Sequence, residues 1–151
     1  MRTAFILMIT LSFMAGCVTL SMAESADWIY YGVEKLGVHY YDRQSIKSIS
    51  KNVRQVWTKH VITTKEQRNL YIKYLNEKNL PTRGDEDVSY RLDLSEINCS
   101  TAEIRLTSYS EYNTSSMPIY SESNLMLKPL PIPPDSIANA LYKIVCKSTK
   151  K

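Results

Sequence analysis

Glycine, cysteine and histidine are scarce in this chain, and their scarcity excludes several classes of protein. Only four glycines occur among the 151 residues, and none stands in a pattern that wraps a nucleotide phosphate. The three cysteines form no Cys-x-x-Cys pair and no cluster with histidine, which argues against zinc and redox chemistry. The serines and aspartates form no nucleophile elbow. We therefore expect a protein that is not an enzyme and has no cofactor and no metal site.

The two histidines do not change this expectation. His39 and His60 both fall in stretches that have the character of β-strands. We expect both to be exposed polar positions on their strands rather than general bases.

Long apolar runs are also absent, except at the N-terminus. Arg2 is followed by the apolar run AFILMITLSFMAG and then by small residues, which is typical of a secretory signal peptide. The run is shorter than the roughly 20 residues that a membrane-spanning helix needs. We interpret residues 1–23 as a signal peptide and residues 24–151 as a single exported domain.

Two processing sites compete. Ser21 and Ala23 are small residues at the positions that a signal peptidase reads, and we favour cleavage after Ala23. In the alternative, Ala15-Gly16-Cys17 is a lipoprotein box, and Cys17 carries a lipid anchor that is the only attachment to a membrane. Both alternatives place the protein in the periplasm, on the outer membrane surface or outside the cell.

Either form of processing removes Cys17 from the thiol count and leaves Cys99 and Cys146. Two cysteines can pair in one way only. Export favours a disulfide over two free buried thiols, because the compartment is oxidising. In the chain-entropy model, closing a loop of roughly 50 residues stabilises a protein by about 4 kcal/mol.

The stretch from Tyr90 to Asn113 has the clearest strand pattern. Apolar and polar residues alternate on both sides of a polar turn that contains Cys99, which predicts two antiparallel strands. Further strands are expected at residues 27–33, 37–42, 52–62 and 117–127. Four prolines between positions 129 and 134 predict an extended connector that cannot join the interior of a sheet.

Two helices complete the expected fold. The first starts at Thr63 or Thr64, each of which has the partner of a capping box three residues later, and ends by Pro81. The second is capped by Asp135 or Ser136 and carries Cys146 near its end. The sequence thus predicts an α+β fold, with an antiparallel sheet of about six strands, a C-terminal helix packed on it, and a helical insertion between the third and fourth strands.

Charge and tyrosine are distributed unevenly. Residues 43–83 contain ten basic and two acidic residues, whereas residues 85–113 contain seven acidic and two basic ones. This split predicts a basic binding face, unless neighbouring strands interleave both signs on a solvated surface. The candidate residues are Lys47, Lys51, Arg54, Lys59, Lys65 and Arg68. The eleven tyrosines suit both half-buried strands and binding surfaces. No module that reads nucleic acid is visible.

The order of short motifs along the chain is informative as a whole. An aromatic first strand is followed by a YYD and SI element, by VxxVW, by YRLDLSEINC with STAEIRLTSYSEY, and finally by PPDSIANALYKIVC. This order, from Trp28 to Cys146, resembles the surface-adhesin protein E family of Gram-negative bacteria. The resemblance implies a sheet flanked by a helix, a disulfide between Cys99 and Cys146, export to the envelope, and binding of host matrix or plasma proteins. The helical insertion and the imperfect lipoprotein box depart from the family pattern.

Two functions are consistent with these observations. The first is an exported, non-enzymatic binding protein for an extracellular protein or an anionic glycan. The alternative is an accessory protein of the cell envelope that binds an endogenous partner or pairs with itself as a homodimer through a sheet edge.

Overall fold

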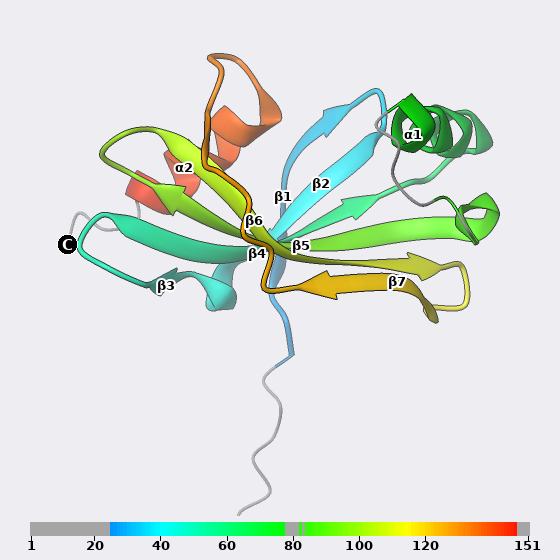
Figure 1. The fold of residues 1–151 in the computed structure, drawn as a ribbon, viewed down its shortest axis with the longest axis horizontal. Helices are drawn as coiled ribbons and strands as arrows, with labels where there is room; N and C mark the ends of the chain where they lie inside the picture. Colours follow the sequence, from blue (N-terminus) through cyan, green and yellow to red (C-terminus); the bar gives the residue numbers. More distant parts are fainter. Residues whose placement is uncertain (1–24, 78–81, 83, 148–151) are drawn as a thin grey trace, which may run out of the picture.

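The computed structural model describes residues 25–77, 82 and 84–147 (Figure 1). The expected signal peptide, the candidate anchor Cys17 and the expected helix end at Pro81 lie outside these residues.

An antiparallel sheet forms the centre of the described chain, as predicted. Its main path follows the chain order β1-β2-β4-β5-β6-β7, and the short strands β3 and β8 pair with β4 and β6. The strands are β1 (Trp28–Glu34), β2 (Gly37–Asp42), β3 (Lys47–Ser48), β4 (Val53–Val61), β5 (Val88–Asn98), β6 (Glu103–Asn113), β7 (Pro118–Ser123) and β8 (Leu130–Pro131). Two 3-10 turns, η1 (Arg43–Ser45) and η2 (Asp85–Asp87), lie between strands.

Strands β5 and β6 are the hairpin expected between Tyr90 and Asn113, each 11 residues long. In the turn, the side-chain oxygen of Asn98 accepts hydrogen bonds from the backbone N–H of Ser100 at 3.0 Å and from its hydroxyl at 2.7 Å. An irregularity in the pairing next to Leu94 places one additional residue in β6. The side chains of β6 therefore change faces at this point, which a strict alternation does not predict.

Two helices, α1 (Lys65–Glu77) and α2 (Ile137–Lys147), lie at opposite ends of the sheet (Figure 1). Helix α1 begins with a capping box, since the backbone N–H of Gln67 donates to Thr64 Oγ1 at 3.1 Å and that of Thr64 donates to Gln67 Oε1 at 3.3 Å. The buried residues Tyr71 and Leu75 pack with Ile62, which directly follows β4, and with Val88 at the start of β5.

Helix α2 is capped by Ser136, whose hydroxyl oxygen accepts from the backbone N–H of Asn139 at 3.1 Å. Its buried residues Leu141 and Val145 pack with a cluster that includes Val56 of β4 and Ile97 of β5. Both helices therefore contact the same face of the sheet, because residues 56, 58 and 60 of β4 point to one side and residues 57, 59 and 61 to the other. We call this side the covered face.

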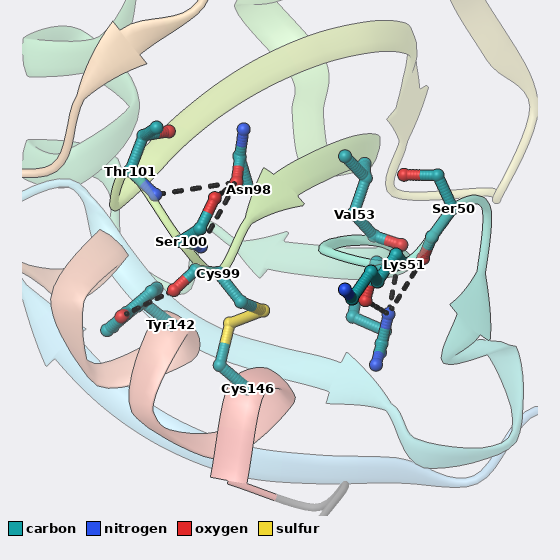
Figure 2. Close-up of a disulfide and its surroundings, with 10 residues drawn as sticks. Ser50, Lys51, Val53, Asn98, Cys99, Ser100, Thr101, Tyr142 and Cys146 are labelled. Atoms are coloured by element: carbon teal, nitrogen blue, oxygen red, sulfur yellow. Dashed lines mark hydrogen bonds between the residues drawn. A yellow bond between two sulfur atoms is a disulfide. The ribbon is translucent and has the colours of Figure 1, made fainter.

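A disulfide joins Cys99, in the β5–β6 turn, to Cys146 of α2, as predicted (Figure 2). The Cα atoms of the two residues are 5.6 Å apart. The hydroxyl of Tyr142 donates to the backbone carbonyl of Cys99 at 3.2 Å, so α2 is fastened to the turn by two contacts.

The segment after β6 differs from the expectation of one long strand at 117–127. Strand β7 ends at Ser123, and the chain then follows the edge of β6, where the N–H of Leu125 donates to the carbonyl of Thr107 at 3.0 Å. The proline connector forms β8 at the same edge. Proline is tolerated there because an edge strand needs only half of its backbone hydrogen bonds.

Candidate functional site

No helix of the described chain packs on the second side of the sheet, which we call the open face. In β4 and β5 it is formed by the residues that alternate with the buried ones, among them Trp57, Lys59 and Tyr90. The strand register extends this surface over five strands. Its aromatic and aliphatic members are Trp28, Tyr30, Val33, Val38, Tyr40, Trp57, Val61, Tyr90, Leu92, Leu94 and Tyr112.

The aromatic rings of the open face are arranged in pairs. Tyr30 and Tyr40 meet edge to face with ring centroids 6.1 Å apart, and Tyr90 and Tyr112 are stacked with centroids 4.7 Å apart. All of these side chains remain partly accessible to solvent. A contiguous apolar surface that stays partly accessible marks an interaction site, and tyrosine and tryptophan are enriched in protein interfaces.

Lys59 lies in the middle of this surface. Its ammonium is 4.4 Å from the centroid of the Tyr90 ring and 5.9 Å from that of the Trp28 ring. Cation–π attraction holds the side chain over the two rings and keeps the positive charge at the centre of the apolar patch. The open face therefore offers an apolar contact area together with one central cation.

The six basic residues predicted as one binding face are distributed over both faces of the sheet. Lys59 lies on the open face, and Lys47 of β3, which pairs with Gln55, is on the same side. Arg54 lies on the opposite side of β4, where Nη1 donates to the carbonyl of Ser50 at 3.2 Å. Lys51 is exposed in the loop before β4.

The two basic residues of the α1 region lie apart from the open face. Lys65 is exposed at the first turn of α1, and Arg68 Nε donates to the backbone carbonyl of Val88 at 2.9 Å. Ligand binding by the basic residues stays a prediction, and we retain Lys47 and Lys59 as the ones that share the aromatic surface.

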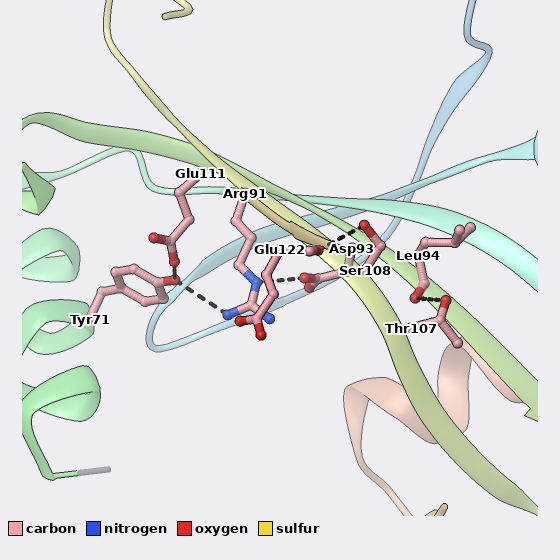
Figure 3. Close-up of polar contacts among 8 residues, drawn as sticks. All are labelled: Tyr71, Arg91, Asp93, Leu94, Thr107, Ser108, Glu111 and Glu122. Carbon is pink, nitrogen blue, oxygen red and sulfur yellow. Dashed lines mark hydrogen bonds and ion pairs between the residues drawn. The ribbon is translucent and has the colours of Figure 1, made fainter. Parts of the chain in front are cut away.

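A chain of polar side chains runs between α1 and the covered face (Figure 3). The hydroxyl of Tyr71 donates to the carboxylate of the buried Glu111, and Arg91 Nη1 donates to the Tyr71 hydroxyl at 3.5 Å. Arg91 Nε also pairs with Asp93 Oδ1 at 2.5 Å. Burial raises the pKa of Asp93, while the Arg91 guanidinium acts in the opposite direction.

This cluster was not predicted from the sequence, although one signal was present. The alternation of residues places Arg91, Asp93 and Glu111 on the polar side of a hairpin, which suggests contact with solvent. Arg91 and Asp93 lie two residues apart in β5, and Arg91 faces Glu111 across β5 and β6. Burial of these opposite charges is possible because each has a partner.

The expectation that the histidines are exposed is wrong. His39 and His60 face each other across β2 and β4 on the covered face, and both are buried. Burial lowers the pKa of both imidazoles, and it lowers that of His60 to about 4. The ring of Tyr71 from α1 lies 6.1 Å from that of His60, so α1 shields His60 from solvent.

The described residues can also be compared with the requirements of a membrane-spanning helix and of a metal site. None of the helices in this part of the chain is both long and apolar enough to cross a membrane. Within the same residues, no group of three or more His, Cys, Asp or Glu side chains is placed to hold a metal ion.

Comparison with known proteins identifies a family and a fold. The family model described as "Surface-adhesin protein E" matches residues 28–147. A solved structure of protein E from Haemophilus influenzae has a TM-score of 0.50 and 15% identity, with 84% of this chain and 92% of that chain covered. A structure of protein E from non-typeable Haemophilus influenzae gives a TM-score of 0.49 and 14% identity, covering 84% and 79%. No curated protein matches the chain.

Proposed function

The chain belongs to the surface-adhesin protein E family, and we propose that it acts as an exported binding protein that contacts a protein ligand through its open face. The observation that carries this proposal is the aromatic and aliphatic surface around Lys59. Family membership supports a binding role without catalysis.

The composition of the open face favours a protein over an anionic glycan as the ligand. Its core is apolar, with tyrosine and tryptophan as anchors, which is typical of the residues that dominate protein–protein binding energy. One central cation suits a partner with a carboxylate opposite Lys59. A highly sulfated or phosphorylated glycan would be better matched by several basic residues on one surface.

Export and surface display are part of the same proposal. They are supported by the signal-like N-terminus and by the family. Intact-mass measurement of the protein from its producing cells distinguishes the two processing sites. A chain that begins at Glu24 indicates simple secretion, and an acylated N-terminal Cys17 indicates a lipid anchor. A mass that retains residues 1–23 would contradict both.

Binding to immobilised matrix proteins, plasma proteins and anionic glycans tests the proposed surface. Tyr30, which is 56% exposed, is the most suitable residue to change, and Met117, 59% exposed in the β6–β7 turn, supplies a matched control. We expect Tyr30→Ser to weaken binding about tenfold or more and Met117→Ser to leave it unchanged. Equal binding by wild type and Tyr30→Ser would exclude the open face.

The same variants distinguish an accessory role in the cell envelope from binding of a host ligand. Cross-linking and pull-down from the producing organism would then recover an endogenous partner through wild type but not through Tyr30→Ser. In that case the open face is the binding surface, and the ligand belongs to the bacterium itself.

A further inference from the structure

A hollow of about 590 Å³ lies on the covered face between α1 and the connector that follows β7. Its floor is formed by β5 and β6, and Tyr74 of α1 lines one side. This volume falls within the range of small-molecule sites in proteins, roughly 300–1,000 Å³. The hollow lies on the other side of the sheet from the open face, so a ligand bound in it would not depend on the proposed function.

Most of the lining is apolar. Ile104 and Leu106 of β6 contribute to the floor, and Leu127 and Leu130 of the connector complete the apolar lining. Leu127 is 50% exposed and Leu130 is 65% exposed. Leucines that border a hollow and remain in contact with water are stabilised when they become fully buried. An apolar chain placed here would supply that burial.

The polar part of the lining has an excess of one positive charge. Arg91 and Lys128 are the cations, and Asp93 is the anion. Asp93 is already paired with Arg91 Nε, and Nη1 of Arg91 donates to Tyr71. The Arg91 guanidinium also lies over the Tyr109 ring, with Cζ 4.3 Å from its centroid, and the side chain of Lys128 is exposed. The unmatched charge therefore suits a ligand with a single negative charge.

We propose that this hollow binds an amphiphile with one anionic head group, such as an unbranched aliphatic carboxylate. The apolar chain lies against the leucines and Tyr74. The head group accepts a hydrogen bond from Lys128 at the rim and is attracted by the positive charge of Arg91. Charge complementarity supports an anion over a cation, and the apolar walls support an alkyl chain over a sugar.

Calorimetric titration of the purified protein with decanoate, with decanol as the uncharged comparison, tests this site. We expect saturable binding of one decanoate per chain. The double variant Leu127→Ser with Leu130→Ser should weaken it about tenfold or more, because each serine removes apolar contact. Lys128→Gln should weaken binding of decanoate and leave that of decanol unchanged. Arg91 is not a suitable position for this test, since its replacement leaves Asp93 unpaired.

Tyr30→Ser is the control for adsorption to the other apolar surface, and it should bind decanoate as wild type does. The proposal is overturned if decanoate does not saturate, if the Leu127 and Leu130 variant binds it unchanged, or if Lys128→Gln affects decanoate and decanol alike. Loss of binding in Tyr30→Ser would assign the ligand to the open face instead. Because protein binding depends on Tyr30 and decanoate binding on Leu127, either proposal can fail while the other holds.

Discussion

The imidazole rings of His39 and His60 are stacked in parallel across β2 and β4, with their centroids 4.5 Å apart. Nε2 of His39 lies 3.0 Å from Glu34 Oε1, which favours a proton on that ring. Nε2 of the buried His60 has no hydrogen-bond partner among the described residues, and its strand neighbour is Arg91. A proton on His60 would therefore meet positive charge and no compensating carboxylate.

This arrangement predicts acid lability. The pKa of His60 is about 4 in the folded protein, below the ordinary value of about 6.5 in the unfolded chain. Between these values the unfolded chain binds a proton that the folded chain does not, so stability is full above about pH 6.5 and falls as the pH is lowered. The loss attributable to His60 is about 3 kcal/mol by pH 4.

Urea unfolding at several pH values measures this loss. A His60→Gln variant is the comparison, because carboxylates also titrate at the acid end and are common to both proteins. We expect the variant to lose less stability between pH 6.5 and pH 4 than wild type does. Parallel profiles for the two proteins would show that His60 stays neutral in both states.

Removal of the disulfide should lower stability and loosen α2. The bond closes a loop with a sequence separation of 47 residues, for which the chain-entropy model gives about 4 kcal/mol. We expect Cys99→Ser, combined with Cys146→Ser to avoid a free thiol, to lower the free energy of unfolding by about that much, which urea unfolding detects as a lower midpoint. An unchanged midpoint, with or without reductant, would show that packing of Leu141 and Val145 is sufficient by itself.

The Arg91–Asp93 pair should behave as a unit. Replacing only Arg91 with leucine leaves the Asp93 carboxylate partly buried and unpaired, which costs about 3 kcal/mol. Replacing both residues with leucine should cost less than the sum of the single changes. A double-mutant cycle measures the difference as a coupling energy. Additive losses would mean that water, rather than the partner, compensates each charge.

Lys59 should control the salt dependence of ligand binding. Lys59→Met retains the apolar stem over Tyr90 and Trp28 and removes the charge. We expect the variant to retain part of its affinity for a protein ligand and to lose the decrease that added salt causes in wild type, since screening acts on the charge alone. If the salt dependence persists in Lys59→Met, the electrostatic contact is made by Lys47 or by another residue instead.

The elements that depend on local sequence could be predicted. The alternation from Tyr90 to Asn113 gave the hairpin, Thr64 with Gln67 gave the start of α1, and the two late cysteines gave the disulfide. The hairpin and the helix start depend on residues close in sequence, and two cysteines can pair in one way only.

The side of the sheet that the helices cover could not be predicted in the same way. Strand β5 alternates between Tyr90 and Leu92 on one side and Arg91 and Asp93 on the other. A two-residue period shows that the sides differ but does not show which is buried. Helix α1 covers the charged part of this side, where Tyr71 contacts Arg91 and Glu111, whereas α2 covers an apolar part around Val56 and Ile97. The apolar side is left open. The histidines are buried because they lie on the covered side, where Tyr71 of α1 lies beside His60.

The disulfide also makes part of the chain a closed covalent ring. Strands β6, β7 and β8 and nearly all of α2 lie between Cys99 and Cys146, whereas β1 to β5 and α1 lie outside. The connector within the ring is accessible, with Met126 91% exposed. A protease that cuts there opens the ring but releases no fragment, so the two pieces stay joined, with the mass of one added water, until the disulfide is reduced. A protein built in this way tolerates one cut in this accessible connector without losing its C-terminal helix.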